Sequence, residues 1–107
     1  MFIKETDVAD ALDWLNQNAI PAAKARAERQ YCEEYLRVVK ATLMQEHHNL
    51  SGIAQEREAY ADPRYLQQLD AIREAVERDE RNRFLRSTKE TLIEAWRSQC
   101  ANERTRI

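Results

Sequence analysis

Helix-breaking residues are almost absent from this sequence, whose 107 residues include one glycine and two prolines. A β-protein of this size needs a turn about every 8–12 residues, and turns depend on these residue types. Three breakers therefore exclude a β-sandwich and a Rossmann-type domain. Fifteen alanines, with many Glu, Arg, Gln and Leu residues, give the composition of long helices. The sequence predicts an all-α fold: a long antiparallel helical hairpin that resembles a coiled coil, with two short additional helices.

Breakers and capping residues divide the chain into four predicted helices within a single domain, residues 1–107. Thr6 is a candidate N-cap, and Pro21 ends the first helix and opens the second. Ser51 and the pair Asp62-Pro63 begin two further helices. The predicted ranges are a short helix at 7–18, a long helix at 21–47, a short helix at 52–61 and a long helix at 63–102.

The second predicted helix carries the most regular apolar line. Its members advance by alternating steps of three and four residues, which is typical of a coiled-coil seam, and Arg29 is its one charged member. Tyr31, Tyr35 and Val38 widen the apolar face beside it. The seam positions are Ala22, Ala25, Arg29, Cys32, Leu36, Val39 and Leu43.

In the third and fourth helices the apolar pattern is weaker. The third places Ile53 and Tyr60 on its apolar side. Between two stripes of the fourth helix lie residues 77–83, which contain no apolar side chain. This segment is either a continuous helix that crosses solvent and is held by charge pairs such as Glu77–Arg81 and Asp79–Arg83, or a kink that splits the helix. The predicted stripes are Tyr65, Leu69, Ile72 and Val76, followed by Phe84, Thr88, Thr91 or Leu92, Ala95 and Cys100.

No residue pattern indicates catalysis or metal binding. Glu46, His47 and His48 are consecutive, so on a helix their side chains diverge by about 100° per residue, and no HExxH or CxxC spacing is present. One glycine cannot build a phosphate-binding loop. The two cysteines, Cys32 and Cys100, are interpreted as small buried apolar residues. We therefore expect no enzymatic activity and no cofactor or metal.

Charge is distributed unevenly along the chain, although the net charge is only −2. Residues 1–20 carry a charge of −3 and residues 81–107 a charge of +4, and arginine outnumbers lysine 13 to 4. Arginine favours planar pairing with carboxylates or phosphates. The alternatives are ordinary solvated charge pairs for the basic residues and a core anchor for the tryptophan. The candidate partner or nucleic-acid contacts are Arg78, Arg81, Arg86, Lys89, Trp96 and Arg97.

The supply of large apolar side chains is small, because Val, Ile, Leu and Phe together number 21 of 107. We therefore expect a homo-oligomer, with a dimer favoured, or docking on another protein. No apolar run reaches the length of a membrane span, and the first residues do not form a signal peptide. We expect a cytoplasmic protein with no membrane contact.

Several segments after residue 20 resemble a group of small proteins of tailed bacteriophages and prophages. They are Ala23–Arg29, Glu34–Arg37, Lys40-Ala41 with Leu43-Met44, Ala54–Tyr65, Glu94–Ser98 and Ala101–Arg104. Members of this group are often encoded among early, DNA-recombination genes. The resemblance implies no activity and no catalytic residues.

Two functions of different classes follow as hypotheses. The first is a non-enzymatic accessory to phage DNA metabolism or recombination, which acts in the host cytoplasm through protein contacts or weak nucleic-acid contacts. The alternative is an inhibitor of a host defence system, such as a restriction or CRISPR effector, whose carboxylates occupy the place of phosphates. The acid-rich first helix and Asp70, Glu74, Glu77, Asp79 and Glu80 motivate this alternative, and a virion component is a third possibility.

Overall fold

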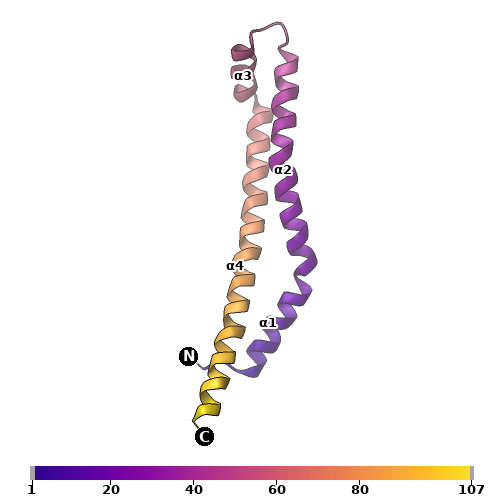
Figure 1. The fold of residues 1–107 in the computed structure, drawn as a ribbon. Helices are drawn as coiled ribbons and strands as arrows, with labels where there is room; N and C mark the ends of the chain where they lie inside the picture. Colours follow the sequence, from indigo (N-terminus) through magenta and orange to yellow (C-terminus); the bar gives the residue numbers. More distant parts are fainter. Residues whose placement is uncertain (1, 107) are drawn as a thin grey trace. The chain divides into compact units, whose positions relative to one another are not determined.

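The computed structural model describes residues 2–106, and within that range it contains four α-helices and no strand. This confirms the predicted all-α class. The helices follow one another along the chain with short connections (Figure 1). They are α1 (Glu5–Gln17), α2 (Ala19–Glu46), α3 (Gly52–Ala61) and α4 (Pro63–Thr105).

The first helix begins earlier than the sequence predicts. Lys4 is the N-cap of α1, and its backbone N–H donates to the Asp7 carboxylate at 3.0 Å. Thr6 lies inside the helix, so its prediction as the N-cap is wrong. An acid in the first turn that accepts the free N–H of the N-cap residue explains the earlier start.

A single residue, Asn18, separates α1 from α2. Its N–H donates to the Trp14 carbonyl at 2.9 Å, and its carbonyl accepts the Ala22 N–H at 2.9 Å. Pro21 is therefore the third residue of α2 rather than the first. The first four N–H groups of a helix have no partner within it, so a proline at this position loses no hydrogen bond.

The starts of α3 and α4 agree with their capping signals. The Ser51 hydroxyl accepts the Ala54 N–H at 3.3 Å, and the Asp62 carboxylate accepts the Arg64 N–H at 2.8 Å. Pro63 is the first residue of α4. The helix is unbroken through residues 77–83 and ends at Thr105 instead of 102, so the interpretation in which this segment splits the helix is wrong.

The chain divides into two compact units. Unit 1 comprises the described residues up to Ala23 together with those from Glu80 onward, and unit 2 comprises Lys24–Asp79. Helices α2 and α4 each continue from one unit into the other. The single-domain assignment stays a prediction.

In unit 2, α2 and α4 run side by side in opposite directions (Figure 1). Arg29 pairs with Asp79 at 3.2 Å, and the Gln68 side-chain amide donates to the Cys32 carbonyl at 2.8 Å. Near the end of α2, Arg64 pairs with Glu46 at 2.6 Å. Residue numbers thus rise along α2 as they fall along α4.

In unit 1, α1 and the second half of α4 are also antiparallel. Gln99 exchanges two hydrogen bonds with the Ile3 backbone, at 3.0 and 2.9 Å. Asn18 donates to Asn82 at 3.3 Å near the other end of α1. Both ends of α1 are therefore tied to α4 by polar side chains.

The predicted seam of α2 is confirmed, since none of its seven members is exposed. The same steps of three and four residues continue backwards through α1, where the members are again buried or half-buried. The additional seam members are Val8, Ala11, Leu15 and Asn18.

The predicted stripes of α4 are confirmed only in part. In the first stripe, Tyr65, Ile72 and Val76 are half-buried and Leu69 is 40% exposed, while the most buried residues of this half are Ala75 and Asp79. In the second stripe, Leu92 and Cys100 are half-buried, whereas Phe84, Thr88, Thr91 and Ala95 are exposed. Lys89, Ile93 and Trp96, which lie beside the second stripe, are half-buried in their place.

The prediction for α3 is also wrong. Ile53 is 77% exposed and Tyr60 is 45% exposed. The side chain that α3 buries is Ala59, at 0% exposure. A small residue allows close approach, and the larger apolar groups of this helix are left outside.

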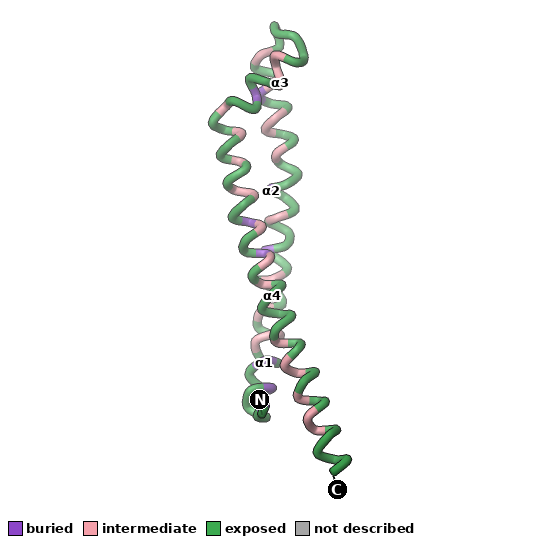
Figure 2. Tube along the Cα trace, turned by 90° about the vertical axis from the view of Figure 1, so that its left-hand side faces the viewer, coloured by how far each residue is buried: buried purple, intermediate pink, exposed green. Residues whose placement is uncertain are grey.

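Buried apolar side chains are few and small. Leu43 is the only large side chain fully buried in the described chain, and Figure 2 shows buried positions as isolated points along an otherwise exposed or half-buried tube. A pair of helices has one contact line, so most of the surface of each helix remains open.

Candidate interaction surface

The sequence predicts that the charged segment of α4, residues 77–83, crosses solvent, but one of its side chains is buried: Asp79 is 6% exposed. Its carboxylate accepts a hydrogen bond from Arg29, which also pairs with Glu33 at 2.9 Å. Asp79 therefore faces α2, and Arg83 pairs with Glu80 at 3.1 Å. The one charged member of the predicted seam thus has a buried partner that the sequence pattern did not identify.

A second polar cluster joins α3 to α2. Lys40 donates to Glu56 at 3.0 Å and to the Tyr60 hydroxyl at 2.9 Å, and the Tyr60 hydroxyl donates to Glu56 at 2.9 Å. These hydrogen bonds raise the pKa of Lys40, Tyr60 first among the causes, and the bond from Lys40 lowers the pKa of Glu56. The cluster fastens α3 to α2.

A third cluster lies where α2 ends and α4 begins. Arg64 pairs with both Glu46 and Asp62, at 2.6 and 3.0 Å. The hydrogen bonds from Arg64 lower the pKa of each carboxyl group. The three side chains thus pair with one another and join the end of α2 to the start of α4.

Most predicted contact residues in unit 1 already have intramolecular partners. Arg86 pairs with Glu90 at 4.0 Å, and Arg97 pairs with Glu94 at 3.0 Å. The Lys89 ammonium lies 5.9 Å from the centre of the Trp14 ring. Arg81 is exposed on the same helix. A basic surface that is alternately neutralised attracts phosphates weakly.

Arg78 belongs to unit 2, where it is exposed near Cys32. Burial raises the pKa of the Cys32 thiol, and the hydrogen bond to Glu28 at 3.5 Å adds to that rise. Cys32 is buried as predicted, and Cys100 is only half-buried. A buried thiol with a raised pKa is a poor nucleophile.

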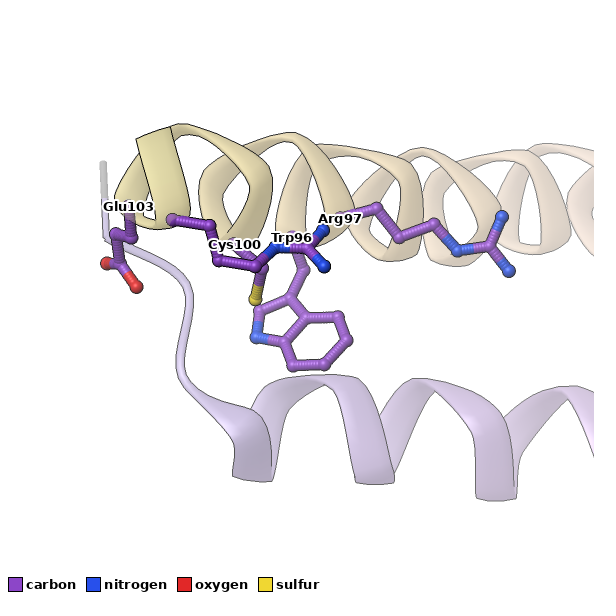
Figure 3. A pocket seen from close by; sticks show the side chains of 5 residues that line it. Trp96, Arg97, Cys100 and Glu103 are labelled. Atoms are coloured by element: carbon purple, nitrogen blue, oxygen red, sulfur yellow. The ribbon is translucent and has the colours of Figure 1, made fainter. Parts of the chain in front are cut away.

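The predicted residues Trp96 and Arg97 come together with the end of α4. With Cys100, Glu103 and Arg104 they line an open hollow of about 720 Å³. In Figure 3 the Trp96 indole and the Cys100 sulfur point from α4 toward α1. A lining that combines an indole ring with two arginines and a glutamate suits an amphipathic peptide better than a small apolar ligand.

The acidic residues of α4 that motivate the inhibitor hypothesis differ in exposure. Asp79 is buried, Glu74 and Glu77 are exposed, and the exposed Asp70 pairs with Arg73 at 3.5 Å. Glu80 pairs with Arg83. On α1, by contrast, Glu5, Asp10 and Asp13 are all exposed.

Among residues 2–106, no group of three or more His, Cys, Asp or Glu side chains is placed to hold a metal ion. Over the same residues, no helix is both long enough and apolar enough to cross a membrane.

Unit 2 has an exposed apolar surface on α2. The sequence predicts that three residues widen the buried face of this helix, and this prediction is wrong: Tyr31, Tyr35 and Val38 are 63%, 41% and 52% exposed. We call these three residues the tyrosine face. The two rings stack at 5.7 Å between centres and 14° between planes. The signal that could have separated them from the core is their constant place one residue before a seam member.

Comparisons with family models, with curated proteins and with solved structures find no match to this chain.

Proposed function

We propose that this chain is a non-enzymatic helical interaction protein that works as a homo-oligomer in the host cytoplasm. Its role is that of an accessory to phage DNA metabolism or recombination, exerted mainly through protein contacts. The phage assignment rests on the sequence resemblance described above. The interaction class rests on the surface of the chain.

The observation that carries the interaction class is the accessible surface area. A folded monomer of 12.6 kDa exposes about 6,200 Å² by the size scaling of globular proteins, whereas this chain exposes 8325 Å². The excess, roughly 2,000 Å², is as large as the area that stable interfaces bury. Exposed apolar side chains such as Phe84, Leu66 and Tyr31 contribute to it.

The hollow at the end of α4 is the proposed docking site for the protein partner. Trp96 is half-buried there, which leaves part of the indole for contact, and tryptophan and arginine are the residue types most often dominant in interfaces. A peptide segment with an apolar side chain for the indole and an acid for Arg97 or Arg104 has the matching chemistry.

Affinity capture from phage-infected cells tests the proposal. The tagged chain is expected to retain a phage recombinase or single-strand-binding protein, and the Trp96→Ala/Arg104→Ala variant is expected to lose it. Glu58→Gln, an exposed change on α3, is the matched control and should retain the partner. Capture of a host nuclease instead would favour the inhibitor hypothesis, which the exposed carboxylates of α1 support. Absence of any specific partner would contradict the proposal.

Direct nucleic-acid binding is the secondary contact in this proposal and has its own test. We expect weak binding to a labelled oligonucleotide, with a slope of log K against log salt of about −0.9 per neutralised phosphate for duplex DNA. Because Arg86 and Arg97 pair with acids, few phosphates should be neutralised and the slope should be shallow. A steep slope typical of many contacts would make DNA, rather than protein, the main partner.

A further inference from the structure

The tyrosine face belongs to a second regular line on α2. Tyr31, Tyr35 and Val38 continue at both ends through Glu28, Thr42 and Gln45, again in steps of three and four residues. Each member from Glu28 to Thr42 precedes a member of the buried seam, so the two lines lie about 100° apart around the helix. Helix α2 therefore presents one line to α4 and leaves a second line of coiled-coil spacing open.

The open line is suited to a dry contact at its centre. The two stacked rings and Val38 present apolar area, and the Thr42 hydroxyl already donates to the Val38 carbonyl at 2.8 Å. Ala27 and Ala41 lie along one flank and are also exposed. Small flanking residues allow the backbone of another helix to approach closely.

We propose that the tyrosine face binds a second copy of this chain, with α2 packed antiparallel against α2 of that copy. This inference rests on the proposed function, because that function includes a homo-oligomer and the tyrosine face is assigned here as its interface. A line with steps of three and four matches a helix with the same repeat, and a second copy always supplies one. The three side chains of the tyrosine face are 63%, 41% and 52% exposed, so this chain leaves the face open to such a partner.

Charge selects the antiparallel direction. In a parallel dimer, Glu28 of each copy would face its own equivalent, which places like charges together. In the antiparallel register that sets Tyr35 against Val38 of the second copy, Tyr31 meets Thr42 and Glu28 meets Gln45. Gln45 is exposed, and its amide can donate to a carboxylate.

Sedimentation equilibrium of the full chain from about 1 µM to about 1 mM tests the interface. We expect the wild-type chain to dimerise. Truncating one hot-spot residue weakens binding by about 30-fold, and two-fold symmetry applies each change twice, so Tyr35→Lys should raise the dissociation constant by about 1000-fold. Since Tyr35 is exposed, far-ultraviolet circular dichroism should show that the variant keeps its helical content.

Phe84→Lys is the matched control, because Phe84 is 71% exposed but lies outside the tyrosine face. It should leave the dissociation constant within about threefold of wild type. A wild-type chain that stays monomeric at about 1 mM overturns the proposal, as does a dimer that Tyr35→Lys leaves intact.

A distance measurement tests the direction. With a spin label at Ala27→Cys in a Cys32→Ala/Cys100→Ser background, the antiparallel register separates the two labels by about 28 Å along the helix, whereas a parallel dimer holds them about 10 Å apart. The short distance overturns the antiparallel arrangement. If the wild-type chain dimerises but captures no partner, only the proposed docking function is contradicted. If it captures a partner but stays monomeric, only the dimer proposal is contradicted.

Discussion

At the scale of single residues, unit 2 contains a buried carboxylate, that of Asp79. The Asp79 side chain is 8% exposed and its partner Arg29 is 28% exposed. A buried charge is tolerated only with its counter-charge, and such a pair restricts the register in which two helices can pack. Arg29 was identified from the sequence as the odd member of an apolar line, but its partner was not. Asp79 stands among seven polar residues, and only packing decides which of them turns inward.

Asp79→Asn should lower the free energy of unfolding by about 2 kcal/mol, because Arg29 would lose its buried counter-charge and keep the more exposed Glu33. Denaturant unfolding measures the change. Asp70→Asn is the control: its carboxylate is exposed, and its pair with Arg73 should be worth less than about 0.5 kcal/mol. Replacing both Arg29 and Asp79 with leucine should restore stability, and a double variant as weak as Asp79→Asn would contradict this account.

Leu43 is the large side chain that the described chain buries most completely. Leu43→Ala should cost about 2.5–4 kcal/mol, since it removes apolar contacts and leaves a cavity between two helices. Thermal or denaturant unfolding reports the loss.

Leu66→Ala is the comparison for Leu43, because Leu66 is 55% exposed. It should cost less than about 1 kcal/mol. Equal costs at the two positions would mean that Leu66 is covered in solution.

At the scale of elements, the short helix α3 is held to α2 by hydrogen bonds between polar side chains more than by buried apolar side chains. Helix α3 buries one alanine, and its link to α2 is the cluster of Lys40, Glu56 and Tyr60. The bounds of α3 could be predicted because Ser51 and Asp62 cap backbone groups that lie only a few residues away in the sequence. Its packing could not, since Ile53 and Tyr60 have the larger apolar side chains and yet are exposed.

Acidification should release α3. The pKa of Glu56 is lowered in the folded chain, so its contribution is complete above the ordinary carboxyl pKa of about 4.3 and is lost as the pH falls below it. The pKa of Lys40 is raised, so its contribution is complete below about pH 10 and is lost as the pH rises further. Amide hydrogen exchange of residues 52–61, which form α3, should therefore accelerate below about pH 4 relative to α2.

Glu56→Gln should remove most of this acid response, because the titrating group is gone. Glu58→Gln, on the same helix, should keep it. An unchanged response in Glu56→Gln would assign the effect to another carboxyl group, such as Glu46 or Asp62, whose pKa values are also lowered.

At the scale of the whole molecule, the surface area is the dominant fact. The chain folds nearly all of its described residues into helices, yet half of the buried apolar residues among them are alanine. A chain of this kind gains stability when a second chain covers the open helix faces, and mass action then links stability to concentration.

The thermal unfolding midpoint should rise with protein concentration. For a two-state dimer of this size, a tenfold increase should raise it by about 3 °C. Scanning calorimetry at several concentrations measures the shift. The Tyr35→Lys variant should show no such dependence, and a constant midpoint for the wild-type chain would indicate that the folded monomer is self-sufficient.

Sequence alone determined the class of the fold, the starts of α3 and α4, and the seam of α2. Each depends on interactions within a few residues: too few breakers for turns, side-chain caps on backbone N–H groups, and a repeat that matches the helical period. These are local effects, so the order of residue types is enough to predict them.

Tertiary structure decided which lines of α3 and α4 are buried, which carboxylate meets Arg29, and that the tyrosine face is exposed. A helix with several weak apolar lines has nearly equal choices, and the helix packed against it selects one. In the first half of α4 the most buried positions are Ala75 and Asp79, because close packing against α2 favours a small side chain and a counter-charge to Arg29 there.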